Sequence, residues 1–98
     1  MELTVEDLKV GQVYRAKRPG QVGVLLGQQY VNDRQIIWAG VEEVQYDSPA
    51  VTDGRRYPRV TKEAFLKWAS HTVELPTPDW MTWDEYQQTK ARTHKESK

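Results

Sequence analysis

Few residues of this chain could carry out catalytic or metal chemistry, and their spacing forms none of the usual sites. The two histidines, His71 and His94, lie far apart, and neither has an acidic partner at metal-ligand spacing. Cysteine is absent, which excludes disulfides, thiolate metal sites and cysteine nucleophiles. A Ser–His–Asp site from Ser48, His71 and Asp47 has no support from spacing, because any chain of this size offers such a set. We therefore predict a protein that is not an enzyme and that uses no metal or cofactor.

The acidic pairs and the glycines also lack catalytic patterns. The neighbouring carboxylates at Glu42–Glu43 and at Asp84–Glu85 point to different faces of any regular structure, which favours solvated charge over acid–base work. Gly23 and Gly27 are not followed by the Lys-Ser/Thr pair and the helix of a phosphate-binding loop. The chemistry that remains is that of aromatic and arginine side chains, which bind rather than react.

The first stretch that offers such side chains is the segment from Tyr46 to Tyr57. It is long for a hairpin connection, and it ends in Arg55, Arg56 and Tyr57. Long loops in compact domains are often functional, so we predict that these three residues contribute to a binding surface. The alternative is an ordered surface connection whose tyrosines are half-buried at the rim of a sheet.

The second stretch runs from Leu75 to Tyr86 and gathers Trp80, Met81, Trp83 and Tyr86 beside prolines and acids. Trp83 and Tyr86 are three residues apart, so they share one face of a helix. Tryptophan, tyrosine and methionine are enriched where protein interfaces concentrate their binding energy. Trp80, Trp83 and Tyr86 are therefore further candidates for partner binding, and the alternative is that they cover the flank of the domain.

The length and composition fit one small domain. Four tryptophans and five tyrosines supply apolar area that compensates for a hydrophobic content of only 38%. We expect a compact α+β domain over residues 1–75, and a proline spacer, a C-terminal helix and a charged tail over residues 76–98. The first residues lack the pattern of a signal peptide, and no apolar run is long enough for a membrane span, so we expect a cytoplasmic protein without membrane contact.

The hydrophobic pattern changes at residue 61. Before it, one or two helical turns from Thr4 precede short alternating segments, which predict strands over 12–17, 22–30, 35–38, 41–46 and 55–60. After Thr61, a predicted N-cap, apolar residues at helical spacing predict a helix over 61–70 whose Trp68 is buried against the sheet. Thr82 and Glu85 match a capping box, which predicts a last helix over 83–91.

The predicted fold class follows from this order of elements. It is α+β: a small curled antiparallel sheet of four or five short strands, an SH3-like half-barrel in outline, with a packing helix and a C-terminal helix.

Four segments of the chain resemble the anti-RecBCD accessory protein family of lambdoid phages. They are the run from Val5 to Pro19, residues 44–49 (Val-Gln-Tyr-Asp-Ser-Pro), residues 54–58 (Gly-Arg-Arg-Tyr-Pro) and residues 65–69 (Phe-Leu-Lys-Trp-Ala). The order of these motifs, the length and the lack of cysteine are also similar to that family. The resemblance covers roughly residues 4–75, and the Trp-rich C-terminal part matches less closely.

The resemblance implies a phage-encoded protein that binds the host RecBCD helicase–nuclease in the host cytoplasm, chiefly through its RecC subunit. Such a protein modifies the enzyme so that linear phage DNA is protected and phage recombination proceeds. A host peptidyl-prolyl isomerase is implied as a further partner, with Pro19, Pro49, Pro76 and Pro78 as candidate targets. The motifs have no assigned chemical role, so no site residue is carried over from the family.

The charge distribution bears on the choice of partner. Basic and acidic residues number 14 each, so the net charge is zero, whereas a duplex binder is usually basic and a DNA mimic strongly acidic. We therefore expect direct binding to nucleic acid to be weak.

The alternative function is an SH3-like nucleic-acid-binding module. It would use Tyr46 or Tyr57 to stack on bases and two basic clusters to contact phosphates. The clusters are Arg15, Lys17 and Arg18, and Arg55, Arg56 and Arg59. This alternative requires both clusters to converge on one face beside the tyrosines.

Overall fold

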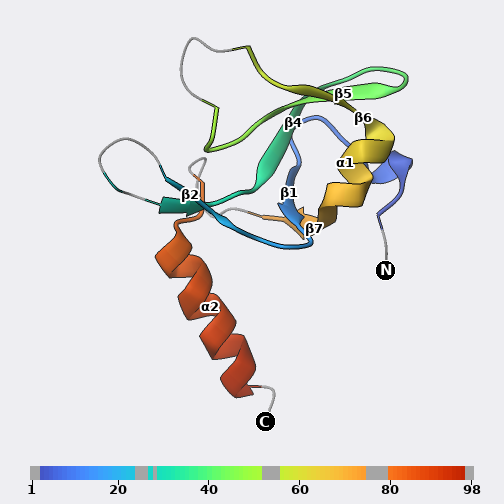
Figure 1. Ribbon diagram of the computed structural model, residues 1–98. Helices are drawn as coiled ribbons and strands as arrows, with labels where there is room; N and C mark the ends of the chain where they lie inside the picture. Colours follow the sequence, from blue (N-terminus) through green and yellow to red (C-terminus); the bar gives the residue numbers. More distant parts are fainter. Residues whose placement is uncertain (1–2, 24–26, 28, 52–55, 75–79, 97–98) are drawn as a thin grey trace.

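The computed structural model describes residues 3–23, 27, 29–51, 56–74 and 80–96 (Figure 1). Within these residues a short 3-10 helix precedes six strands, a helix, a seventh strand and a second helix. The elements are η1 (Val5–Asp7), β1 (Val13–Ala16), β2 (Gln21–Gly23), β3 (Gln29–Val31), β4 (Arg34–Ala39), β5 (Glu43–Asp47), β6 (Arg59–Thr61), α1 (Lys62–Trp68), β7 (Ala69–Val73) and α2 (Trp83–Glu96). In the part of the chain that the structure describes, neither α-helix has the length and apolar character needed to cross a membrane.

The main sheet has five antiparallel strands in the order β6-β5-β4-β1-β7, and β2 and β3 form a separate antiparallel pair. The outer strands of the main sheet, β6 and β7, are not paired with each other, so the sheet stays open. Helix α1 covers one face of this sheet, and α2 extends away from it (Figure 1). The predicted α+β class, with a small curled antiparallel sheet, a packing helix and a C-terminal helix, is confirmed.

One predicted strand is wrong in its topology. The segment 22–30 does not run straight: β2 and β3 pair antiparallel, with Val22 opposite Tyr30. Gly27 lies between them with φ at 93°, a left-handed conformation that glycine adopts without steric cost. Residues 24–26 and 28 lie outside the described part of the chain. The alternating pattern of 22–30 is therefore shared by two short strands rather than one.

The helix predicted over 61–70 ends at Trp68, and the next five residues form β7, a strand that the sequence analysis missed. The start is as expected, because the Thr61 hydroxyl accepts a hydrogen bond from the Ala64 backbone N–H at 3.1 Å. Strand β7 pairs with β1, placing Val73 opposite Val13. Its sequence, Ala-Ser-His-Thr-Val, is mostly polar because β7 lies at the edge of the sheet, so hydrophobic alternation does not reveal it.

The remaining elements differ in extent. Strand β6, predicted over 55–60, covers only Arg59–Thr61, and α2 continues past residue 91 to Glu96. The capping box that predicts α2 is present: the Thr82 hydroxyl accepts from the Glu85 N–H, and the Glu85 carboxylate accepts from the Thr82 N–H, both at 3.2 Å. The predicted proline spacer, residues 76–78, lies outside the described residues.

Phe65 of α1 is the centre of the core and is fully buried. The rings of Tyr14 and Trp68 lie with their centroids 5.2 Å and 5.3 Å from its own, and that of Tyr46 lies 6.1 Å away. Trp68, predicted to be buried, is only half-buried. It is the last residue of α1 and therefore lies at the rim of the core, where the Arg34 guanidinium covers its ring.

Buried Tyr14 also holds the N-terminal segment. Its hydroxyl donates to the Asp7 carbonyl and accepts from the Lys9 N–H at 2.8 Å, and burial raises the pKa of this tyrosine. The Asp7 carboxylate accepts hydrogen bonds from the backbone and the hydroxyl of Thr4, which lower the pKa of Asp7. These contacts fix η1 against the edge of the core.

A buried ion pair lies where the main sheet meets the β2–β3 pair and α2. Both oxygens of Asp33 accept from the Arg15 guanidinium at 3.0 Å, and the side chains of Arg15 and Asp33 are 10% and 0% exposed. The same guanidinium lies over the Tyr86 ring, 5.0 Å from its centroid, and donates to the Met81 sulfur at 3.3 Å. The Val31 N–H donates to the Met81 carbonyl at 3.0 Å, so the segment that leads into α2 is attached to β3 through the backbone as well.

The packing of the core predicts different costs in stability for two aromatic residues of α1. Phe65→Ala should lower the free energy of unfolding by about 3–5 kcal/mol, because a fully buried aromatic leaves a cavity. Trp68→Ala should cost clearly less, because part of this ring already faces solvent. Denaturant titration of both variants measures the difference, and Val41→Ala, which removes an exposed side chain, is the control. Equal costs for both variants would contradict this view of the core.

The buried pair makes a second prediction. Asp33→Ala leaves the Arg15 charge buried without a partner and should cost about 3–5 kcal/mol in urea unfolding. The matched control is Lys67→Met, which breaks the exposed Lys67–Glu63 pair, with nitrogen and oxygen 3.7 Å apart, and should cost at most a few tenths of a kcal/mol. If Asp33→Ala costs no more than the control, the Arg15–Asp33 pair contributes nothing to folding.

Candidate binding surface

The structure places the predicted partner-binding residues in two separate groups. Arg56 and Tyr57 are exposed and lie just before β6, whereas Trp80, Trp83 and Tyr86 lie at the start of α2 beside β3. Strands β5 and β6 and helix α2 lie at opposite ends of the molecule in Figure 1. The predicted residues therefore do not form one site. Arg55, which was predicted with them, lies outside the described residues.

The C-terminal group is partly occupied by packing within the domain. Trp80, Trp83 and Tyr86 are all half-buried. The rings of Trp83 and Tyr86 contact each other with centroids 5.2 Å apart, and Tyr86 also lies under the Arg15 guanidinium. These aromatics attach α2 to the rest of the fold, so only part of their surface is open to a partner.

The more exposed aromatics lie on the face of the main sheet that α1 does not cover. We call this surface the Trp38 face, and it consists of Trp38, Gln45, Arg56, Tyr57 and Arg59. Trp38 of β4 pairs with Gln45 of β5, which pairs with Arg59 of β6, so the three side chains lie side by side. The Arg59 guanidinium lies over the Trp38 ring, 4.8 Å from its centroid. Both Trp38 and Tyr57 are 42% exposed.

Gln45 links this face to the segment before β6. Its side-chain amide donates a hydrogen bond to the Tyr57 carbonyl at 3.0 Å. Together with Arg56, Tyr57, Pro58 and Arg59 it lines a shallow, open depression. The hollow thus brings together the Tyr57 ring, two arginines and an amide, and Trp38 lies next to it under Arg59. These are groups that protein interfaces favour.

A β-bulge explains why Trp38 faces outward. Ile36 pairs with Tyr46 and Trp38 pairs with Gln45, so one residue of β4 is extra between the two pairs. In a regular strand Ile36 and Trp38 would share a face, whereas the bulge turns Trp38 to the side opposite the buried Ile36. The sequence analysis treated Trp38 only as a strand residue, because alternation alone does not show a bulge.

The Trp38 indole packs against the backbone of Gly40. A Cβ atom built on Gly40 would lie only 2.5 Å from Cη2 and 3.0 Å from Cζ2 of the indole. The ring therefore lies directly against the backbone at Gly40, and Arg59 covers it from β6. These two contacts define the position and orientation of the indole.

The described members of the two basic clusters of the alternative function do not converge. Arg15 is buried against Asp33, and Lys17 and Arg18, which follow β1, are exposed. Strands β1 and β6 are separated by β4 and β5, about 14 Å at the usual strand spacing, so the first cluster is far from Arg59. Tyr46, proposed to stack on bases, is buried in the core.

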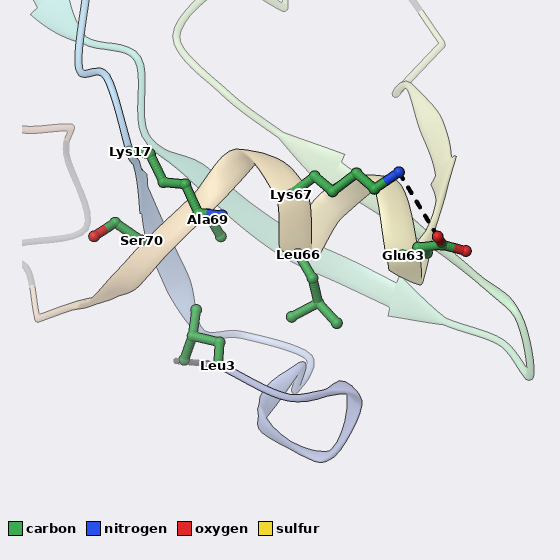
Figure 2. A pocket seen from close by; sticks show the side chains of 7 residues that line it. All are labelled: Leu3, Lys17, Glu63, Leu66, Lys67, Ala69 and Ser70. Atoms are coloured by element: carbon green, nitrogen blue, oxygen red, sulfur yellow. Dashed lines mark ion pairs between the residues drawn. The ribbon is translucent and has the colours of Figure 1, made fainter. Parts of the chain in front are cut away.

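A second hollow lies between the N-terminal segment and α1 (Figure 2). Leu66 points from α1 toward Leu3, and these two leucines with Ala69 form its apolar part. Lys67, which also lines the hollow, extends along the helix toward Glu63, with which it pairs. This hollow has no group that singles out a ligand.

Among the described residues no cluster of three or more histidine and carboxylate side chains could hold a metal ion. Comparison of the chain with known protein families, curated proteins and solved structures gives no match.

The contact between the Trp38 indole and Gly40 leads to a prediction. Gly40→Ala should displace the indole from the backbone and from Arg59, at little cost in stability, because the clash involves the far end of a side chain. NMR should show a large shift of the Trp38 indole N–H signal. Gly23→Ala is the matched control, since a Cβ there meets nothing within 4 Å and should leave that signal in place. An unchanged indole signal in Gly40→Ala would show that the ring does not rest on Gly40.

Proposed function

We propose that this protein is a non-catalytic domain that binds another protein through the Trp38 face. The observation that carries the proposal is the exposed Trp38 ring, which lies against Gly40 and Arg59 beside Gln45, whose amide in turn donates to the Tyr57 carbonyl. A fixed, exposed indole loses little conformational freedom on binding, and tryptophan, tyrosine and arginine dominate the binding energy of protein interfaces. Tyr57 and Arg56 line the hollow beside it and are proposed to contribute to partner binding.

The partner that we propose is the host RecBCD enzyme, contacted through its RecC subunit. The support for this choice is the resemblance of residues 4–75 to the anti-RecBCD proteins of lambdoid phages. Binding in the host cytoplasm would alter the nuclease so that linear phage DNA survives and recombines. A modulator of this kind needs a binding surface rather than catalytic groups, and the Trp38 face supplies one.

The charge and the geometry favour a protein partner over nucleic acid. The net charge is zero, and the arginine that would begin the first basic cluster, Arg15, is neutralised by Asp33. A surface that binds phosphates through counterion release needs several free cations on one face. The separation of β1 from β6 removes that arrangement from the described residues.

A host prolyl isomerase remains a predicted second partner. Of its candidate targets, Pro49 is buried and Pro19 half-buried, and Pro76 and Pro78 lie outside the described residues. Pro49 is thus shielded from an isomerase in the folded protein, which leaves the other three as candidates.

The test is complex formation with purified RecBCD in the absence of DNA. The wild-type protein should co-elute with RecBCD in size-exclusion chromatography at micromolar concentrations and change the degradation of linear duplex DNA. Trp38→Ala should weaken binding by about 30-fold, equivalent to 2 kcal/mol, without unfolding the domain. Val5→Ala, which truncates an exposed side chain of η1, a segment that contacts α1 on the other side of the sheet, should bind as the wild type does.

Three other outcomes would each revise the proposal. Separate elution with unchanged nuclease activity would exclude RecBCD as the partner. A complex that withstands Trp38→Ala but is lost in Trp83→Ala would move the binding surface to the C-terminal aromatic group. Submicromolar binding to duplex DNA that falls steeply with salt would favour the nucleic-acid-binding module instead.

A further inference from the structure

Arg34, the first residue of β4, is held by aromatic rings on the face of the main sheet that α1 covers. It lies two residues before the buried Ile36 and opposite Tyr14 of β1. Its guanidinium carbon lies 4.3 Å from the ring centroid of Tyr46 and 4.1 Å from that of Trp68. Tyr46 and Trp68 in turn pack on Phe65, so the two rings that hold the cation belong to the core.

The charge of Arg34 has no anionic partner among the described residues. The ion pairs there are Arg15–Asp33 and Lys67–Glu63, and no hydrogen bond to a described residue uses the Arg34 side chain. Every fully buried side-chain nitrogen in this part of the chain has a hydrogen-bond partner. Because the Arg34 nitrogens have no such partner, they are not fully buried, and they are open to solvent while the guanidinium lies over the two rings.

This environment makes Arg34 different from Arg15 and Arg59, the other two described arginines that lie over a ring. Arg15 is neutralised by Asp33, and Arg59 lies over one ring in an exposed position. Arg34 is half-buried over two rings and carries its charge without compensation. Partial burial lowers its pKa, yet an arginine stays protonated, so an anion brought to its open edge would relieve the loss of hydration.

We propose that Arg34 is a receptor for a single oxyanion, a carboxylate or a phosphate group, which binds to the open edge of its guanidinium. Two parallel N–H donors match the two oxygens of such a group. The rings of Tyr46 and Trp68 already fix the plane of the guanidinium, so binding does not have to order a long side chain. The site lies on the sheet face opposite Trp38, so the proposal is independent of the proposed binding to RecBCD.

The experiment is an NMR titration of the ¹⁵N-labelled full chain at neutral pH and constant ionic strength. Sodium acetate, sodium phosphate and sodium chloride are added separately, and the signals followed are Arg34 Nε–H and the indole N–H of Trp68. We expect a saturable shift of both signals in the millimolar range, with acetate for a carboxylate site or with phosphate for a phosphate site, and no saturable shift with chloride. If all three salts give the same response, or if none does up to high millimolar concentrations, the proposal is wrong.

Two lysine variants separate a receptor from a purely structural arginine. Arg34→Lys keeps the charge but loses the two parallel N–H donors of the guanidinium. It should weaken binding of the effective anion by roughly tenfold or more, measured from the shift of the Trp68 indole N–H signal. Arg59→Lys changes an arginine that also covers a tryptophan and should leave the titration unchanged. Equal anion affinity in Arg34→Lys and the wild type would overturn the proposal. If Arg34→Lys does not fold, the wild-type titration at Arg34 Nε–H decides alone.

Discussion

The buried pair of Arg15 and Asp33 is the constraint on which the arrangement of the rest of the chain depends. The β1–β4 and β2–β3 pairings follow one another along one bent hairpin, and the pair lies at the bend. Asp33 alone would bury an uncompensated charge there, and so would Arg15, so neither residue is tolerable without the other. The same guanidinium lies over Tyr86, so the bend also holds the first turns of α2 against the sheet.

The arginines of this fold have different roles. Because Asp33 neutralises it, Arg15 contributes structure and no binding charge. Arg59 and Arg34 each lie over a tryptophan, but on opposite faces of one sheet, since the bulge in β4 turns Trp38 away from Ile36. One open sheet can therefore present two chemically different surfaces, one around an exposed indole and one around a cation held by the core.

The sequence predicts the features that local patterns encode and misses those that pairing creates. The capping residues Thr61 and Thr82 mark both α-helices because a cap is a contact within four residues. Strand β7 is missed because an edge strand of polar residues is stabilised by its partner β1, which lies far away in the sequence. The outward position of Trp38 and the rings over Arg34 come from the register between strands, and neither pattern nor composition records it.

The placement of the tryptophans explains how such a small chain carries so much aromatic surface. None of the four is fully buried; the core is built around Phe65 and Tyr14 instead. Exposed apolar rings favour aggregation unless they are covered. Arg59 over Trp38 and Arg34 over Trp68 cover the rings with charged groups that remain hydrated at their edges. A guanidinium stacked in this way keeps an indole soluble in the free protein and still offers both its N–H donors and the neighbouring ring to a partner, so the same contact serves the unbound and the bound state.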